Sequence, residues 1–273
     1  MNLNDKTNVL IEALPYISKY NKKLVVIKAG GNALSKQDEI IEDIVLLKLL
    51  GMKPIVVHGG GPEIDKEMEK SGIKPIFIDG LRYTDEKVIK SVVKAFSKIN
   101  KEIVKKVKSH GAKAINLKNS LKAEQKHEKY GLVGEITHVD KKKIMAAISK
   151  DFIPVISTLG IGNGKTYNIN ADTAAAHVAV ALKAEKLTIL TNVDGVVIGG
   201  KLQSHVDFKA ALREIKRGII SKGMIPKVNA CIYAVRKKCP KAHLINGLTP
   251  HSLLLEIFTD EGVGTEIVYR NGN

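Results

Sequence analysis

Short apolar runs rich in β-branched residues recur along this chain, and longer stretches with helical periodicity separate them. A run of about four to eight such residues is typical of a strand that is buried on both faces of a sheet. The runs predict strands over 24–28, 55–57, 76–78, 152–159, 187–190, 243–247 and 265–268.

Between these runs, apolar residues recur at the three- and four-residue spacing of amphipathic helices. In the first such stretch, Pro15 is expected to kink or divide the helix. Residues 113–137 are polar and irregular, which favours short hairpins. The pattern predicts helices over 9–20, 39–50, 62–70, 85–108, 141–150, 171–183, 208–217 and 227–238.

Strands that alternate with helices require crossover connections and favour a mostly parallel sheet. We therefore expect an α/β fold in which an open, mostly parallel central sheet lies between helices, with an additional N-terminal helix. The composition does not shift sharply along the chain. We place the division between an N-terminal lobe, 1–183, and a C-terminal lobe, 184–273, where a predicted helix leads into the next strand.

Two of the predicted strands end in glycine turns. The first is followed by Gly30 and Gly31 and carries Lys28 at its end, and the second leads into Gly60 and Gly61. Adjacent glycines let backbone N–H groups approach an anion closely. Because the carboxyl ends of parallel strands meet at one edge, the two turns predict a phosphate site beside the Lys28 ammonium.

The composition narrows the class of protein. The chain has 273 residues, a formal charge of +16, 4% aromatic residues and no tryptophan. Scarce aromatic residues argue against base stacking, so we interpret the lysines as solvated helix faces that also attract anionic substrates. No apolar run approaches the ~20 residues that span a bilayer, and no secretory pattern is present. We expect Cys231 and Cys239 to be reduced thiols of a cytoplasmic protein, without excluding a plastid stroma.

Three further polar positions are candidates for chemistry. Arg82 follows a predicted strand and suits a bidentate carboxylate contact. Asp172 opens a predicted helix, where it is either a cap or a functional carboxylate. Lys227 also lies at a helix start, where its charge opposes the helix dipole. No Walker A motif, zinc-ligand spacing or serine–histidine–aspartate arrangement accompanies them.

Taken in order, these motifs resemble the N-acetyl-L-glutamate kinases of the amino acid kinase family, in their arginine-sensitive form. The resemblance covers about residues 10–267. It rests on the segments 28–32, 58–62, 80–82, 168–175, 190–196, 223–227 and 252–262. The resemblance implies transfer of the γ-phosphoryl group of ATP to the γ-carboxylate of N-acetyl-L-glutamate, the second step of arginine biosynthesis.

The resemblance also implies a role for each site residue. Lys28 and Lys227 would stabilise the transferring phosphoryl group, and Asp172 would hold the two ammonium groups. Four residues would bind the acceptor: Gly60, Gly61, Arg82 and Asn168. The nucleotide, with its Mg²⁺, would contact Gly30, Gly31, Asn192, Val193, Asp194, Gly195, Val196, Val197, Ile219, Ile220 and Ser221.

In the arginine-sensitive form, N-terminal helices join dimers into hexamers and arginine binds near that helix and the tail. By this analogy, an arginine site would include Tyr16, His251, Glu256 and Gly262. The resemblance also leaves open a regulator of the PII type. The N-terminal helix alternatively packs only on its own subunit.

Two other functions remain open at this point. A related kinase would phosphorylate an aminoadipyl or glutamyl group on an acidic carrier protein, which the positive charge favours. A basic protein that binds nucleic acid without catalysis is the third possibility, and it rests on charge alone.

Overall fold

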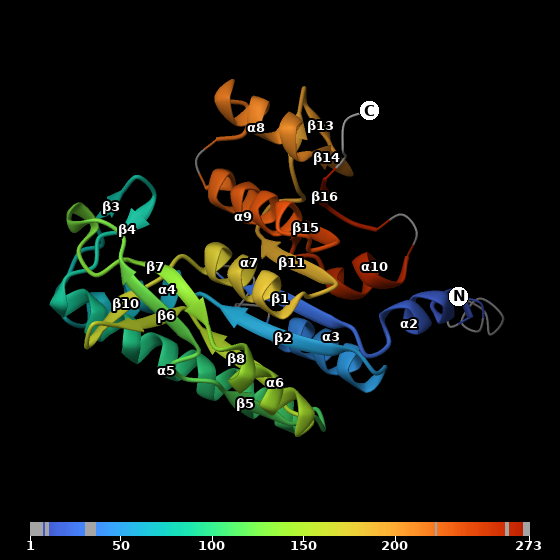
Figure 1. Cartoon of the computed structure of the whole chain (residues 1–273), viewed down its shortest axis with the longest axis horizontal. Helices are drawn as coiled ribbons and strands as arrows, with labels where there is room; N and C mark the ends of the chain where they lie inside the picture. Colours follow the sequence, from blue (N-terminus) through green and yellow to red (C-terminus); the bar gives the residue numbers. More distant parts are fainter. Residues whose placement is uncertain (1–7, 9–10, 31–36, 222, 260–261, 270–273) are drawn as a thin grey trace.

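The computed structural model describes residues 8, 11–30, 37–221, 223–259 and 262–269 (Figure 1). Its centre is an eight-stranded sheet with the order β14-β16-β15-β11-β1-β2-β8-β5. All neighbouring strands are parallel except β15 and β16, which confirms the predicted fold class. The strands are β1 (Leu24–Ala29), β2 (Lys53–His58), β5 (Ala114–Asn116), β8 (Ile153–Ser157), β11 (Lys186–Thr191), β14 (His205–Asp207), β15 (Lys241–Asn246) and β16 (Thr265–Val268).

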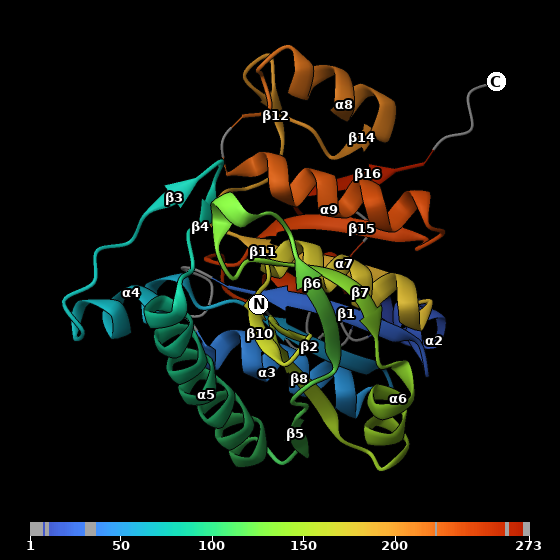
Figure 2. The same ribbon diagram turned by 60° about the vertical axis from the view of Figure 1, so that its left-hand side comes forward.

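Helices cover both faces of this sheet (Figures 1 and 2). One face packs against α3 (Gln37–Leu49), α5 (Glu86–Ser109) and α10 (Ser252–Phe258). The other packs against α6 (Lys141–Ser149), α7 (Ala171–Leu182) and α9 (Met224–Arg236). The strands β1, β2 and β11 are buried along almost their whole length, as the apolar runs predicted.

Smaller elements surround this core. They are α2 (Leu14–Tyr20), α4 (Gly61–Glu69), the hairpin of β3 (Phe77–Ile78) and β4 (Leu81–Arg82), η2 (Glu128–Tyr130), the hairpin of β12 (Val197–Ile198) and β13 (Lys201–Leu202), and α8 (Phe208–Lys216). A second sheet has the order β10-β9-β6-β7, from β6 (Leu121–Gln125), β7 (Gly134–Val139), β9 (Leu159–Gly162) and β10 (Lys165–Asn168).

One sequence prediction is wrong at this level, and another is confirmed. The single strand predicted over 152–159 is wrong, because the chain leaves the central sheet after Ser157 and enters the second sheet at Leu159. Hydrophobicity alone does not reveal this break, because no residue from Ile153 to Gly160 is exposed. Pro15 lies in the first turn of α2, at a position that needs no N–H donor, and a turn at Ala13 separates α2 from the helical residues Ile11 and Glu12. The predicted division of this helix is therefore confirmed.

The order of the strands creates a switch point at β1. From β1 the chain passes through α3 to β2 on one side, and it returns much later through α7 to β11 on the other side. A crevice opens beyond the carboxyl ends of strands at such a point. Both glycine turns lie there, because β1 and β2 are parallel and Ala29 pairs with His58. Within the described residues, none of the helices has the length and apolarity needed to cross a membrane.

Candidate active site

A cavity of about 370 Å³ lies beyond the carboxyl ends of β1 and β2; we call it the central cavity. The structure brings together there all of the predicted catalytic and acceptor-binding residues, together with one predicted nucleotide residue. They are Lys28, Gly30, Gly60, Gly61, Arg82, Asn168, Asp172 and Lys227. Gly31, the neighbouring predicted residue, lies outside the described residues.

Three charged side chains form the centre of this cavity. Lys28 Nζ lies 2.9 Å from Asp172 Oδ1, and Lys227 Nζ donates a hydrogen bond to Asp172 Oδ2 at 3.0 Å. The Lys28 contact is an ion pair without hydrogen-bond geometry. Lys28 is the last residue but one of β1, Asp172 lies in the first turn of α7, and Lys227 lies in the first turn of α9, so three elements far apart in the sequence build the cluster.

The cluster carries a positive charge that its own carboxylate does not balance. Burial by itself would raise the pKa of Asp172, but the ammonium groups of Lys28 and Lys227 outweigh this and hold it below its ordinary value. Asp172 is therefore ionised at neutral pH. Two ammonium groups thus share one carboxylate, and the remaining charge faces a cavity where an anion is stabilised more strongly than in water.

Two glycines lie close to neighbouring side chains around this cluster, so a side chain at either position would displace them. A Cβ at Gly30 would lie 3.0 Å from Lys28 Nζ, and a Cβ at Gly60 would lie 2.4 Å from Ile99 Cδ1 on α5. Beneath the second turn, His58 is fully buried and packs edge-on against Phe96. Burial lowers the pKa of His58 to about 4, so the ring is neutral and supports the turn structurally.

Arg82, on β4, is held in place from several sides. Its Nη1 donates to Asp65 Oδ1 at 2.6 Å, and its guanidinium lies 4.8 Å from the ring centroid of Phe77. Its side chain is only 7% exposed, so its orientation is fixed before any ligand arrives. Sequence reasoning missed Asp65, although an acid on a helix that begins at the second glycine turn was the available signal.

Asn168 ends β10 and lines the same cavity. Its Nδ2 donates to Thr84 Oγ1 at 3.2 Å, and Thr84 Oγ1 donates to the Arg82 carbonyl oxygen at 2.8 Å. A single buried hydroxyl therefore connects two of the four residues that were predicted to bind the acceptor. Sequence analysis did not identify Thr84.

The other predicted nucleotide residues do not line the central cavity. Val196 and Ile220 are buried in the hydrophobic core, and the Val196 N–H donates to Thr265 Oγ1 at 2.8 Å. Asp194 accepts a hydrogen bond from Asn246 at 2.8 Å. The exposed residues of the group are Asn192, Val193, Asp194, Val197, Ile219 and Ser221.

A second cavity, of about 550 Å³, lies between α2, β11, β15, α10 and β16; we call it the tail pocket. Three of the four residues predicted for an arginine site line it: Tyr16, Glu256 and Gly262. The fourth, His251, is not among the lining residues; its Nδ1 lies 2.7 Å from Asp43 Oδ1 on α3. His251 therefore joins α10 to α3 instead of facing the pocket.

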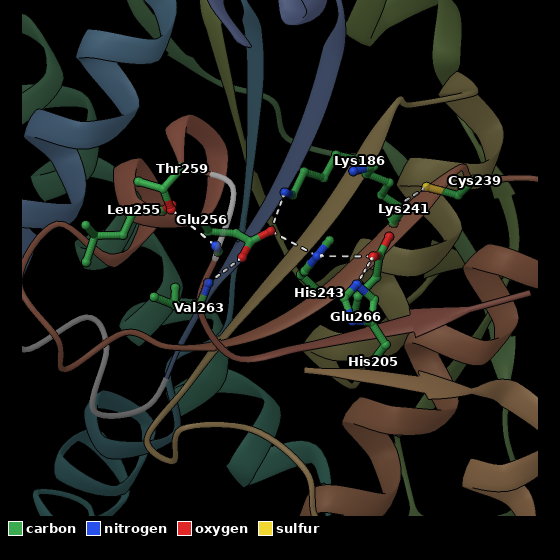
Figure 3. Close-up of polar contacts among 11 residues, drawn as sticks. Lys186, His205, Cys239, Lys241, His243, Leu255, Glu256, Thr259, Val263 and Glu266 are labelled. Atoms are coloured by element: carbon green, nitrogen blue, oxygen red, sulfur yellow. Dashed lines mark hydrogen bonds and ion pairs between the residues drawn. The ribbon is translucent and has the colours of Figure 1, made fainter. Parts of the chain in front are cut away.

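At the centre of the tail pocket, Glu256 bridges two basic side chains (Figure 3). Its Oε1 lies 2.6 Å from Lys186 Nζ and 2.9 Å from His243 Nε2, and its Oε2 accepts from the Val263 N–H at 2.9 Å. Although burial opposes ionisation, these donors lower the pKa of Glu256 to about 2. Burial lowers the pKa of both Lys186 and His243.

Sequence reasoning missed Lys186 and His243. The available signal was a basic residue within each of two buried strands, because Lys186 opens β11 and His243 lies inside β15, in register with Thr188. Among the described residues, no group of three histidine, cysteine or acidic side chains could hold a metal ion. Cys231 and Cys239 are both free and buried.

Comparisons with known proteins identify the family of this chain. A sequence model described as the amino acid kinase family matches residues 23–246. The acetylglutamate kinase of Methanococcus maripaludis strain C7 is 45% identical to this chain, and the match covers 96% of this chain and 98% of that protein.

Two kinds of solved structure are also similar. N-acetylglutamate synthase from Neisseria gonorrhoeae, solved with coenzyme A and N-acetyl-glutamate, has a TM-score of 0.90 at 25% identity; the match covers 97% of this chain but 64% of that one. The same synthase solved with coenzyme A and L-arginine has a TM-score of 0.86. Giardia carbamate kinase, at 17% identity with 91% and 99% of the chains covered and a TM-score of 0.69, shares the fold. The chain therefore belongs to the amino acid kinase family, and within it to the acetylglutamate kinases.

Proposed function

We propose that this kinase transfers the γ-phosphoryl group of ATP to the γ-carboxylate of N-acetyl-L-glutamate, in arginine biosynthesis. The observation that carries the proposal is the Lys28–Asp172–Lys227 cluster in the central cavity. The relatives named acetylglutamate kinase, matched over nearly the whole chain, support the choice of acceptor.

The chemistry follows from the charges. An acceptor carboxylate oxygen attacks the γ-phosphorus, the bond from phosphorus to the bridging oxygen of the β-phosphate breaks, and ADP leaves with that oxygen. Negative charge spreads over the transferring group, so positioning and electrostatics supply most of the catalysis. Lys28 and Lys227 approach Asp172 from different elements, so a phosphoryl group in the cavity would meet an ammonium group on either side.

The other residues of the cavity suit the two substrates. Arg82 and Asn168 would bind the polar groups at the α-carbon of the acceptor, and the amides of Gly60 and Gly61 would face the phosphoryl group. ATP would bring Mg²⁺ bound mainly by phosphates and water. Its remaining contacts would lie with Gly30, Gly31 and the 192–197 and 219–221 segments of the C-terminal lobe, 184–273, most of whose residues are exposed.

An ADP-release assay tests the proposal. We expect ADP to form only when N-acetyl-L-glutamate is present, with a hydroxamate trap capturing the acyl phosphate. Activity on an aminoadipyl- or glutamyl-carrier protein, without activity on the free acetylated amino acid, would instead support the related carrier-dependent kinase.

We further propose that the tail pocket binds L-arginine as a feedback inhibitor. Its charged lining is balanced, with the lysines Lys19, Lys186 and Lys241 against the acids Asp194, Glu256 and Glu266. A lining with equal numbers of positive and negative side chains suits a ligand that carries both charges. Its carboxylates can pair with the guanidinium of the ligand, and its lysines can pair with the α-carboxylate. The similar synthase solved with L-arginine supports this choice.

Arginine titrations test this second proposal. We expect L-arginine to inhibit the kinase, and we expect Glu256→Gln to weaken inhibition by at least ~10-fold because a charged hydrogen bond is lost. Unchanged inhibition of Glu256→Gln would contradict the placement of the effector.

We also propose that the protein is a homo-oligomer, either a dimer or a hexamer. Its N-terminal segment would form part of the contact between subunits. Ile11 and Leu14 are 63% and 60% exposed, which supports a covering partner. Light scattering of Leu14→Asp should then show a smaller assembly than the unmodified protein.

A further inference from the structure

We propose that Thr84 is a positioning residue that fixes the side-chain amide of Asn168 so that its oxygen faces the substrate. The enzyme would thereby select acceptors that carry an N–H on the α-nitrogen. This inference rests on the proposed function, because it concerns the acceptor side of that reaction.

The argument starts from the single proton of the Thr84 hydroxyl. Thr84 is fully buried, and its Oγ1 lies 2.8 Å from the Arg82 carbonyl oxygen. A carbonyl oxygen can only accept, so the hydroxyl proton is committed to Arg82. The lone pairs of the same hydroxyl are then left to accept from the amide of Asn168, 3.2 Å away.

This determines which way the Asn168 amide points. Only the NH₂ end of the amide can donate to Thr84 Oγ1, so Nδ2 faces the buried threonine. Asn168 lines the central cavity and Thr84 does not. The other amide atom, Oδ1, accepts no hydrogen bond from the described part of the chain, and it is left for the cavity as an acceptor.

The backbone around this contact is held independently of the hydroxyl. The Leu132 N–H donates to the Thr84 carbonyl at 2.5 Å, and the Leu132 carbonyl accepts from the Asn168 N–H at 2.9 Å. Gly131, at φ +67°, passes so close that a Cβ there would lie 2.3 Å from the Thr84 carbonyl oxygen. Removal of the hydroxyl therefore frees the Asn168 amide without releasing the strands that carry it.

An oriented amide oxygen gives the cavity a chemical preference. It accepts a hydrogen bond from the N–H of an acylated amino acid, whereas an ester oxygen at the same position offers no proton and leaves Oδ1 unpaired. An unmatched buried acceptor costs binding. Asn168 without Thr84 could present either end of its amide, and the preference would fall.

The test compares two acceptors that both carry the γ-carboxylate: N-acetyl-L-glutamate and its ester analogue, 2-acetoxyglutarate. For the unmodified enzyme, we expect kcat/KM to favour the amide by ~10- to 100-fold. Thr84→Val keeps the shape but removes the hydroxyl, and it should reduce that ratio by at least ~10-fold. Thr84→Ser retains the hydroxyl and should keep the ratio of the unmodified enzyme. The KM for ATP should not change in either variant.

Thr188→Val is the matched control, because Thr188 is also fully buried but its hydroxyl has no partner. It should keep the ratio of the unmodified enzyme. Thr84→Ala provides the same measurement if the valine variant does not fold. A loss of activity that is equal for both acceptors, with an unchanged ratio, would overturn the inference and leave the proposed function intact. An unmodified enzyme that phosphorylates neither acceptor would overturn the proposed function, and the inference with it.

Discussion

Two buried carboxylates in this molecule, Asp172 and Glu256, each bridge two basic side chains, but the charge that surrounds them differs. In the central cavity, Lys28 and Lys227 face one acid, Asp172, while Arg82 pairs with Asp65. In the tail pocket, three lysines face three acids around Glu256. The two clusters also lie at opposite ends of neighbouring strands, because Lys28 lies near the carboxyl end of β1 and Lys186 begins β11.

The comparison shows that a buried ion pair does not by itself indicate which ligand a site takes. The sign of the charge that remains unpaired is more informative. An excess of cations around Asp172 suits an anion such as a phosphoryl group, while the balanced tail pocket suits a zwitterion. Both acids have lowered pKa values, so the two sites cannot be told apart from their carboxylates.

The largest effect should follow removal of one ammonium group from the central cavity. We expect Lys28→Met and Lys227→Met each to lower kcat by ~10²- to 10³-fold, because the charge they supply is needed most in the transition state. The double variant should lose less than the product of the two effects, since the lysines act as a unit.

Steady-state ADP release measures this effect. Lys23→Met is the control, because Lys23 directly precedes β1 and its side chain is 51% exposed. A near-normal kcat in either lysine variant would show that the excess charge has no catalytic role.

In the tail pocket, the main effect should be on stability. Glu256→Gln leaves the Lys186 ammonium buried without its carboxylate, so we expect urea denaturation to show a loss of about 3–5 kcal/mol. Adding Lys186→Met should recover most of that loss, because a buried methionine needs no counter-ion. A double variant as unstable as the single one would contradict this pairing.

The unfolding free energy should also depend on pH through the ionisation of Glu256. The pKa of Glu256 is lowered to about 2 from an ordinary value of 4.5, so its contribution is fully present above pH 4.5 and is lost as the pH falls toward 2. The difference in unfolding free energy between the unmodified protein and Glu256→Gln should therefore shrink by about 3 kcal/mol over that range. A difference that stays constant down to pH 3 would contradict the assigned pKa.

The smallest effect is expected at the contact that links the tail to α3. Burial raises the pKa of Asp43 to about 6, and the hydrogen bond to Asp43 raises the pKa of His251. Both shifts give stability that is present at low pH and is lost as the pH rises through these values. His251→Asn should cost ~1 kcal/mol or less near pH 6 and nothing measurable near pH 9.

The residues of the central cavity were predictable because each follows or opens a regular element at the carboxyl edge of the sheet. Apolar runs locate the ends of β1 and β2, and those ends place Lys28, Gly30 and Gly60 together. Thr84, Asp65 and Lys186 were not predictable in this way. Their partners are side chains from distant segments, and periodicity does not indicate which distant side chains meet.

His251 and Glu256 illustrate the same limit. They lie five positions apart, yet Glu256 faces the tail pocket while His251 contacts Asp43 on α3. Because His251 precedes α10 with a left-handed backbone, at φ +53°, a helical projection does not describe its direction. Of the four residues predicted for an arginine site, three therefore line one pocket and His251 points elsewhere.

The most direct test of the central claim measures the binding of a planar mimic of the transferring phosphoryl group. Calorimetry would compare MgADP with MgADP plus aluminium fluoride and N-acetyl-L-glutamate, for the unmodified enzyme and for Lys227→Met. We expect the variant to bind MgADP within a few-fold of normal, but to lose ~10²-fold or more in affinity for the mimic. Equal losses for both ligands, or no loss for either, would show that the ammonium pair around Asp172 does not stabilise the transferring group.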